Sequence, residues 1–139
     1  MRYYLFSISI TLFLFNSTLS SESLKAQSMS NLIVGKWYDK EELYNGGYRE
    51  YLLEKKVDGS YKITLRTYDK DGAYKEQIEV GDWGIFGSVY FTISLGDIED
   101  KEEYKILNLS DSEFRYQHIE CEDIYIMKRV SDSFTLDDK

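Results

Sequence analysis

The sequence predicts an all-β protein whose single domain is an antiparallel up-and-down barrel of about eight strands. Short runs of aromatic and β-branched residues alternate with turn residues about every 11 to 15 positions. After residue 26, no stretch keeps a helical spacing of apolar residues over three turns. The chain contains no proline, so no strand is deprived of a backbone hydrogen-bond donor. Sequential antiparallel strands of this kind are typical of a barrel that closes on itself.

The N-terminus has the features of a secretory signal peptide. Arg2 supplies one positive charge, residues 3–15 are apolar, and residues 16–30 are rich in serine. A membrane-spanning helix needs about 20 apolar residues, so the stretch favours a signal peptide over an uncleaved anchor. Small residues at 18–20 and at 26–28 both permit cleavage, and the cleavage site stays open. We therefore expect a periplasmic or secreted protein with no membrane association after cleavage.

Four parts are expected along the chain. Residues 1–26 are the signal peptide and its cleavage region, residues 27–33 a flexible lead-in, residues 34–131 the barrel, and residues 132–139 a polar tail. Each expected strand is an aromatic or β-branched run bounded by Gly, Asp or Ser. The strands are expected, in chain order, at residues 35–39, 48–57, 61–68, 73–80, 82–86, 89–95, 104–109, 113–120 and 123–130.

Turn signals connect these strands. Residues 58–59 and 70–72 end in glycine, which supplies the positive φ that short hairpins require, and Gly87 marks another tight hairpin. Residues 97–103 are strongly acidic and predict a solvated loop. The short connections indicate that consecutive strands are neighbours in the sheet.

Gly35 and Trp37 open the first expected strand, and Arg129 stands near the end of the last. Glycine allows a sharp bend into the barrel, and the indole is large enough to plug one end. A guanidinium laid over that indole would add about 0.5–2 kcal/mol. This combination resembles the lipocalins, which open their first strand with Gly-x-Trp and stack an arginine from the end of the barrel on that tryptophan.

The resemblance extends over residues 32–130 at the level of layout. The second and third lipocalin signatures and the segment for a C-terminal helix are not evident, so the chain is similar to the short bacterial lipocalin-like, calycin-type proteins. The resemblance implies a lipocalin-like barrel that serves as a ligand carrier or as a rigid scaffold. It assigns Gly35, Trp37 and Arg129 a structural role.

The chain is acidic, with 25 Asp and Glu residues against 17 Lys and Arg residues and a net charge of −8. Such a charge repels phosphate and anionic lipid, which argues against nucleic acid as a partner. A macromolecular partner would instead be basic. Cys121 is the single cysteine, so no intramolecular disulfide can form, and stability must come from packing of the many aromatic residues.

Strand alternation predicts which side chains face the interior. It places Tyr61 inside with its apolar neighbours, and it places Glu76 inside together with Ile78 and Val80. Charged groups on such faces need partners, which a ligand could supply, unless they lie in water at the barrel mouth or a bulge shifts the alternation. The residues expected to face a ligand are Arg49, Tyr51, Tyr61, Glu76, Trp83, Tyr116 and His118.

Catalysis and metal binding are not expected. His118 and Cys121 point to opposite faces of an extended chain, and no third group is identified to orient the histidine. One His and one Cys cannot supply the ligands of a structural zinc site. Residues 69–72 resemble the start of a calcium loop, but the later ligand positions hold unsuitable residues. We expect no enzyme, no metal and no cofactor.

Two functions remain open. The first is an exported lipocalin-like binding protein that holds a small, partly apolar or amphipathic ligand in the barrel interior. The alternative is an acidic periplasmic inhibitor or immunity protein that binds a basic enzyme, for which the net charge and residues 97–103 argue. A hollow interior favours the first function, and a filled interior beneath an exposed acidic patch favours the second.

Overall fold

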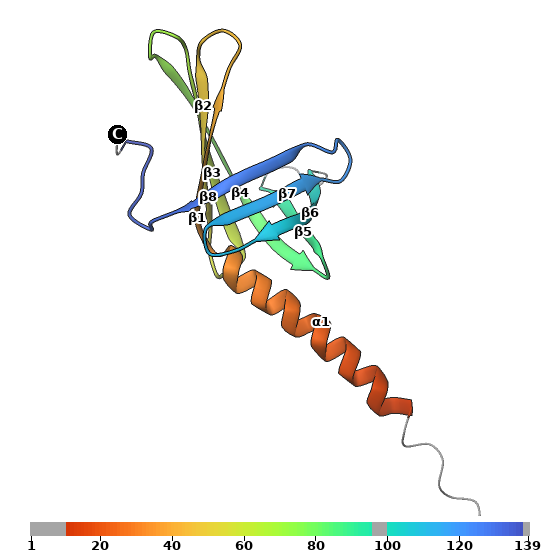
Figure 1. Ribbon diagram of the computed structural model, residues 1–139. Coiled ribbons are helices and arrows are strands. Elements are labelled where there is room, and N and C mark those ends of the chain that lie inside the picture. The colour runs from red at the N-terminus through yellow and green to blue at the C-terminus, as the bar shows by residue number, and fades with distance from the viewer. Residues whose placement is uncertain (1–10, 96–99, 138–139) are drawn as a thin grey trace, which may run out of the picture.

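The computed structural model describes residues 11–95 and 100–137. In these residues the strands form one closed antiparallel barrel in the sequential order β1 to β8, preceded by a helix (Figure 1). The predicted all-β, lipocalin-like up-and-down barrel is confirmed by this strand order. The elements are α1 Thr11–Ile33, β1 Gly35–Glu42, β2 Tyr48–Lys55, β3 Ser60–Tyr68, β4 Tyr74–Phe86, β5 Val89–Ser94, β6 Lys101–Leu109, β7 Glu113–His118 and β8 Ile124–Val130.

β4 is one continuous strand where the sequence predicted two, at 73–80 and 82–86. Gly81 lies at the junction, and its role is close packing. A Cβ at this position would lie 2.2 Å from the carbonyl oxygen of Ile93 and 2.7 Å from the ring of Tyr61. The acidic segment 97–103 also differs from the prediction, because β6 begins at Lys101 and residues 96–99 lie outside the described chain.

The two halves of the barrel differ in height. Residues 74–80 of β4 find strand partners only in β3, and β1 pairs with β8 only over Lys36–Tyr38, among the described residues. The β1–β2 and β3–β4 hairpins therefore rise above the rest of the barrel (Figure 1). Beyond Tyr38, the seam between β1 and β8 is open.

The opposite end of the barrel is closed by Trp37, which is fully buried and packs against Phe114 at 5.6 Å between ring centroids. The guanidinium of Arg129 lies 4.1 Å from the centroid of the indole, as the resemblance implies. Gly35 makes this approach possible, because a Cβ there would lie 2.5 Å from Nη1 of Arg129. Gly35 also has a φ of 129°, which disfavours other residues.

Residues 27–33 were expected to be a flexible lead-in, but they form the last turns of α1. The end of α1 is held by side chains from the barrel. Nε1 of Trp37 donates to the carbonyl oxygen of Ile33 at 2.8 Å, and Arg129 donates to the carbonyl oxygens of Leu32 and Val34. A cation that satisfies the last carbonyl groups also interacts favourably with the helix dipole. The expected lead-in is therefore ordered by the closed end.

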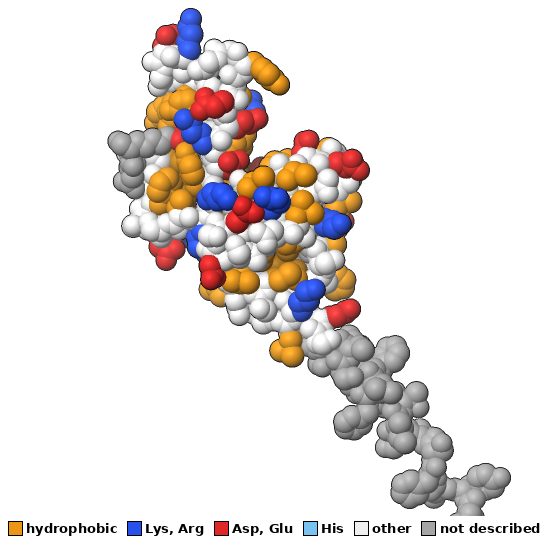
Figure 2. Space-filling view, in the orientation of Figure 1, with side chains coloured by type: hydrophobic (Ala, Val, Ile, Leu, Met, Phe, Trp, Pro, Cys, Tyr) orange, Lys and Arg blue, Asp and Glu red, His pale blue; other side chains and the backbone are white. Residues whose placement is uncertain are grey.

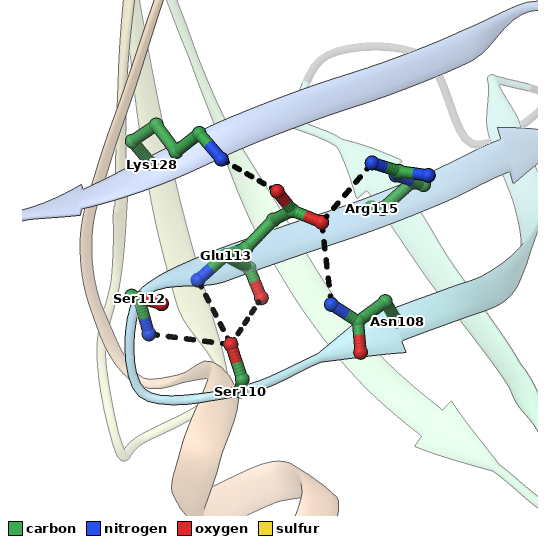
Figure 3. Close-up of polar contacts among 6 residues, drawn as sticks. All are labelled: Asn108, Ser110, Ser112, Glu113, Arg115 and Lys128. Atoms are coloured by element: carbon green, nitrogen blue, oxygen red, sulfur yellow. Dashed lines mark hydrogen bonds and ion pairs between the residues drawn. The ribbon is translucent and has the colours of Figure 1, made fainter.

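The turn between β6 and β7 is fixed by a polar cluster (Figure 3). The hydroxyl oxygen of Ser110 accepts hydrogen bonds from the backbone N–H groups of Ser112 and Glu113. The Glu113 carboxylate pairs with Lys128 at 2.5 Å and with Arg115 at 3.3 Å, and these contacts lower the pKa of Glu113, with the Lys128 hydrogen bond as the largest cause. The cluster joins the turn to β8 beside the closed end.

The C-terminal segment 132–139 was expected to be a polar tail, but its described part packs against the outside of the barrel. Leu136 is only 5% exposed, and the ring of Phe134 meets Tyr38 edge-on at 5.3 Å. Asp137 pairs with Arg66 at 2.7 Å. The tail is held because the outer faces of β1–β3 carry apolar and charged groups that complement it.

Leu136→Ala should lower the free energy of unfolding by about 1 kcal/mol, because the leucine is buried and lines one groove with Leu52 and Thr64 on the outer barrel face. Urea denaturation followed by tyrosine and tryptophan fluorescence would measure the change. Asp132→Ala, at an exposed position of the same segment, serves as the control and should be neutral. Equal stability of both variants would show that the tail does not hold the barrel.

Candidate ligand-binding cavity

The barrel interior contains an open cavity of about 710 Å³, a volume within the usual range for small-molecule sites. Its apolar lining includes Leu53, Ile63 and Met127, which come from β2, β3 and β8. Six tyrosines contribute ring faces and hydroxyl groups to the wall. They are Tyr51, Tyr61, Tyr90, Tyr104, Tyr116 and Tyr125.

The tyrosine rings pack against one another in stacked and edge-on pairs. Tyr116 stacks on Tyr125 at 5.1 Å and meets Tyr104 edge-on at 5.2 Å, while Tyr90 meets Tyr116 edge-on at 5.6 Å. Burial is the largest cause that raises the pKa of the Tyr90, Tyr104 and Tyr116 hydroxyls above the ordinary value. These hydroxyls therefore stay protonated near neutral pH and can donate hydrogen bonds.

Carboxylates supply the negative charges of the cavity wall. Three of them accept hydrogen bonds from tyrosine hydroxyls: Glu79 from Tyr61 at 2.5 Å, Glu41 from Tyr51 at 3.1 Å, and Glu102 from Tyr104. Burial raises the pKa of a fourth, Asp39 on β1. A fifth, Asp123, precedes β8.

The cavity is reached through the open seam. Residues 39–41 of β1 and residues 123–127 beside and within β8 both line it, and these two segments do not pair with each other. Lys40 is the one basic side chain among the described lining residues. Its ammonium group pairs with Glu42 at 3.2 Å and lies 4.2 Å from the Tyr48 ring centroid, so its charge is engaged by neighbours.

Lys55 lies on the inward face of β2 but does not line the cavity. It is 2% exposed, and its Nζ atom has no hydrogen-bond partner among the described residues. The amine lies 4.5 Å from the Tyr90 ring centroid and 5.4 Å from that of Phe114. Burial in these aromatic surroundings lowers the pKa of Lys55 well below its ordinary value.

Three of the residues expected to face a ligand line the cavity: Tyr51, Tyr61 and Tyr116. Arg49 follows the inward face of β2 but lies in the raised hairpin, where it is 43% exposed and its Nη1 atom is 3.9 Å from Glu41.

Trp83 and His118 lie elsewhere. Trp83 is buried and donates from Nε1 to the carbonyl oxygen of Lys56 at 3.1 Å. Nδ1 of His118 accepts hydrogen bonds from the backbone N–H groups of Glu120 and Cys121, so it caps the turn before β8. Neither side chain lines the cavity.

The prediction that Glu76 faces the barrel interior is wrong. In β4 the alternation is the reverse of the prediction, because Gln77 and Glu79 stand opposite the inward Leu65 and Ile63 of β3. Glu76 therefore faces outward, where it pairs with Arg66 at 2.6 Å. The outward apolar side chain of Ile78 borders the groove occupied by the C-terminal tail, which explains why this face of β4 resembled a core face.

Several lining residues were not found from the sequence, and Glu79 and Glu102 are the most informative. Glu102 is the second residue of β6, and it was missed because residues 97–103 were predicted to be a loop. Alternation from Tyr104 would have placed Glu102 inside. Glu79 was missed because the direction of β4 was reversed.

The described residues offer no helix that is long and apolar enough to span a membrane. They also hold no group of three or more His, Cys, Asp or Glu side chains arranged for a metal ion.

No family model matches the chain, and no curated protein matches it. The structure is similar to the crystal structure of a lipocalin-like protein from Bacteroides uniformis ATCC 8492, with a TM-score of 0.49 and 18% sequence identity. The match covers 71% of this chain and 99% of that chain. The fold is established by the strand order of the chain itself.

Proposed function

We propose that this protein is an exported, non-enzymatic binding protein that holds a small, partly apolar molecule inside the barrel. The observation that carries the proposal is the cavity of about 710 Å³, which combines apolar, aromatic and hydrogen-bonding groups. The closed end gives this cavity a rigid base, since Trp37 and Arg129 tie the first and last strands together. Entry takes place through the seam between β1 and β8.

The inhibitor function rests on charge alone. On the face shown in Figure 2, acidic and basic side chains are interspersed rather than gathered into one acidic patch. Most of the acidic segment 97–103 that favoured this function lies either in β6 or outside the described residues. The hollow interior supports small-molecule binding over inhibition of a basic enzyme.

A polarity-sensitive apolar fluorophore should bind the wild-type protein with micromolar affinity, and Ile63→Trp should weaken that binding because the larger ring fills the cavity. A loss of about tenfold or more is expected, measured by fluorescence titration. Glu76→Gln is the matched control, since Glu76 faces outward, and it should leave the affinity unchanged. Absence of binding to the wild type, together with salt-sensitive capture of a basic enzyme, would support the inhibitor function instead.

A further inference from the structure

We propose that the molecule held in the cavity is an amphipathic organic cation, namely an amine or quaternary ammonium compound with an apolar body. This inference rests on the proposed function and specifies its ligand class. Three independent features of the cavity support it: its volume, the sign of the charge on its walls, and the aromatic rings that face it.

The wall charge is negative on several sides. The lining carboxylates come from β1, β4, β6 and the turn before β8. Of these lining carboxylates, only Glu41 has a described basic side chain within ion-pair distance, namely Arg49 at 3.9 Å. The lining carboxylates are Asp39, Glu41, Glu79, Glu102 and Asp123.

Neither nearby lysine neutralises this charge. Lys40 is paired with Glu42, and Lys55 does not line the cavity and is buried among aromatic rings, which disfavours its charged form. A concave site whose charges are mainly of one sign concentrates counter-ions. Five lining carboxylates outnumber the single lining lysine, so the cavity attracts cations and repels anions such as fatty-acid carboxylates.

The carboxylates converge with the aromatic rings. Asp39 on β1 and Glu102 on β6 line the same cavity as Tyr116, and Glu102 accepts a hydrogen bond from the neighbouring Tyr104. Tyr116 also forms a right-angled corner with Tyr104 and a stack with Tyr125. Ring faces beside carboxylates are the combination that recognises ammonium groups through cation–π and charge interactions.

The apolar part of the lining determines the rest of the ligand. Leu53, Ile63 and Met127 offer a surface without charge for a hydrocarbon or aromatic body. A neutral molecule could occupy the same surface, but it would displace water from the carboxylates without offering them a positive partner. A cation with an apolar body matches both surfaces.

The test compares three indole probes that differ mainly in charge: tryptamine as the cation, tryptophol as the neutral analogue and indole-acetate as the anion. Isothermal titration calorimetry with the wild-type protein should show tryptamine binding about tenfold or more tighter than tryptophol, with indole-acetate weakest. Raising the ionic strength should weaken only the tryptamine interaction appreciably.

Glu102→Gln should weaken tryptamine binding about fivefold or more and leave tryptophol binding unchanged, since the change removes charge and keeps the shape. Glu103→Gln is the matched control, because Glu103 is the next residue of β6, faces outward and pairs with Lys101 at 2.7 Å. Thermal denaturation of both variants would establish that they are folded.

The outcomes separate the cation inference from the proposed function. Equal affinity for tryptamine and tryptophol, tighter binding of indole-acetate, or equal effects of the two substitutions would overturn the cation inference and leave small-molecule binding intact. Failure of all three probes while the apolar fluorophore binds would have the same meaning. Failure of every probe, including the fluorophore, would overturn the proposed function as well.

Discussion

Trp37→Ala should lower the free energy of unfolding by about 3–5 kcal/mol, the range expected for removal of a fully buried large aromatic side chain. The substitution leaves a cavity against Phe114 and removes the hydrogen bond to the carbonyl oxygen of Ile33. It also removes the surface on which Arg129 lies. Urea denaturation monitored by far-ultraviolet circular dichroism would measure the loss.

Arg129→Ala tests the same end of the barrel and should cost less than Trp37→Ala. The guanidinium contributes a cation–π contact and hydrogen bonds to carbonyl groups at the end of α1, all of them partly accessible to solvent. Lys105→Ala, at an exposed position of β6, is the control and should be neutral. Unchanged unfolding of both Trp37→Ala and Arg129→Ala would show that the lipocalin resemblance has no energetic basis.

Lys55→Met should raise the free energy of unfolding by about 1–3 kcal/mol, the usual cost of a buried polar group without a hydrogen bond. Methionine keeps the length of the side chain and its contacts with Tyr90 and Phe114. A decrease in stability would contradict the prediction, because it would show that the amine has a favourable partner. Lys62→Met, on the exposed outer face of β3, is the control.

The pH dependence of stability provides a second readout for Lys55. Its pKa in the folded protein is lowered well below 10.5 by burial, so the unfolded chain binds more protons over that interval. The contribution of Lys55 to stability therefore increases as the pH rises from its lowered pKa toward the ordinary lysine pKa. The slope should be smaller in Lys55→Met, provided that measurements stay below the ordinary tyrosine pKa of 10.0, above which unfolded tyrosines ionise.

The fold and its closed end could be predicted from local signals. Hairpin glycines and strand alternation give the order of the strands, and the contact between Trp37 and Arg129 follows from their places in the first and last strands. The direction of β4 could not be predicted from its own residues. Ile78 and Val80 look like core residues in isolation, but the register with β3 turns them outward.

The cavity was harder to predict than the fold. Tyr51, Tyr61 and Tyr116 were identified because aromatic residues on an inward face are expected in a core or a pocket. Glu79 was not identified because the direction of β4 was predicted in reverse, and Glu102 was not identified because residues 97–103 were predicted to be a loop. The pairing of β4 with β3 is needed to show that Glu79 faces the cavity, whereas Glu102 follows from alternation once β6 is known to begin at Lys101.

The difference in height between the two barrel halves has a consequence for aggregation. The raised parts of β1 and β4 present backbone groups to which the strand of another molecule could add. The β1 edge carries Lys40, Glu41 and Glu42, and the β4 edge carries charges at residues 75, 76 and 79. An added strand would have to desolvate these charges, so their placement protects the protein against edge-to-edge polymerisation.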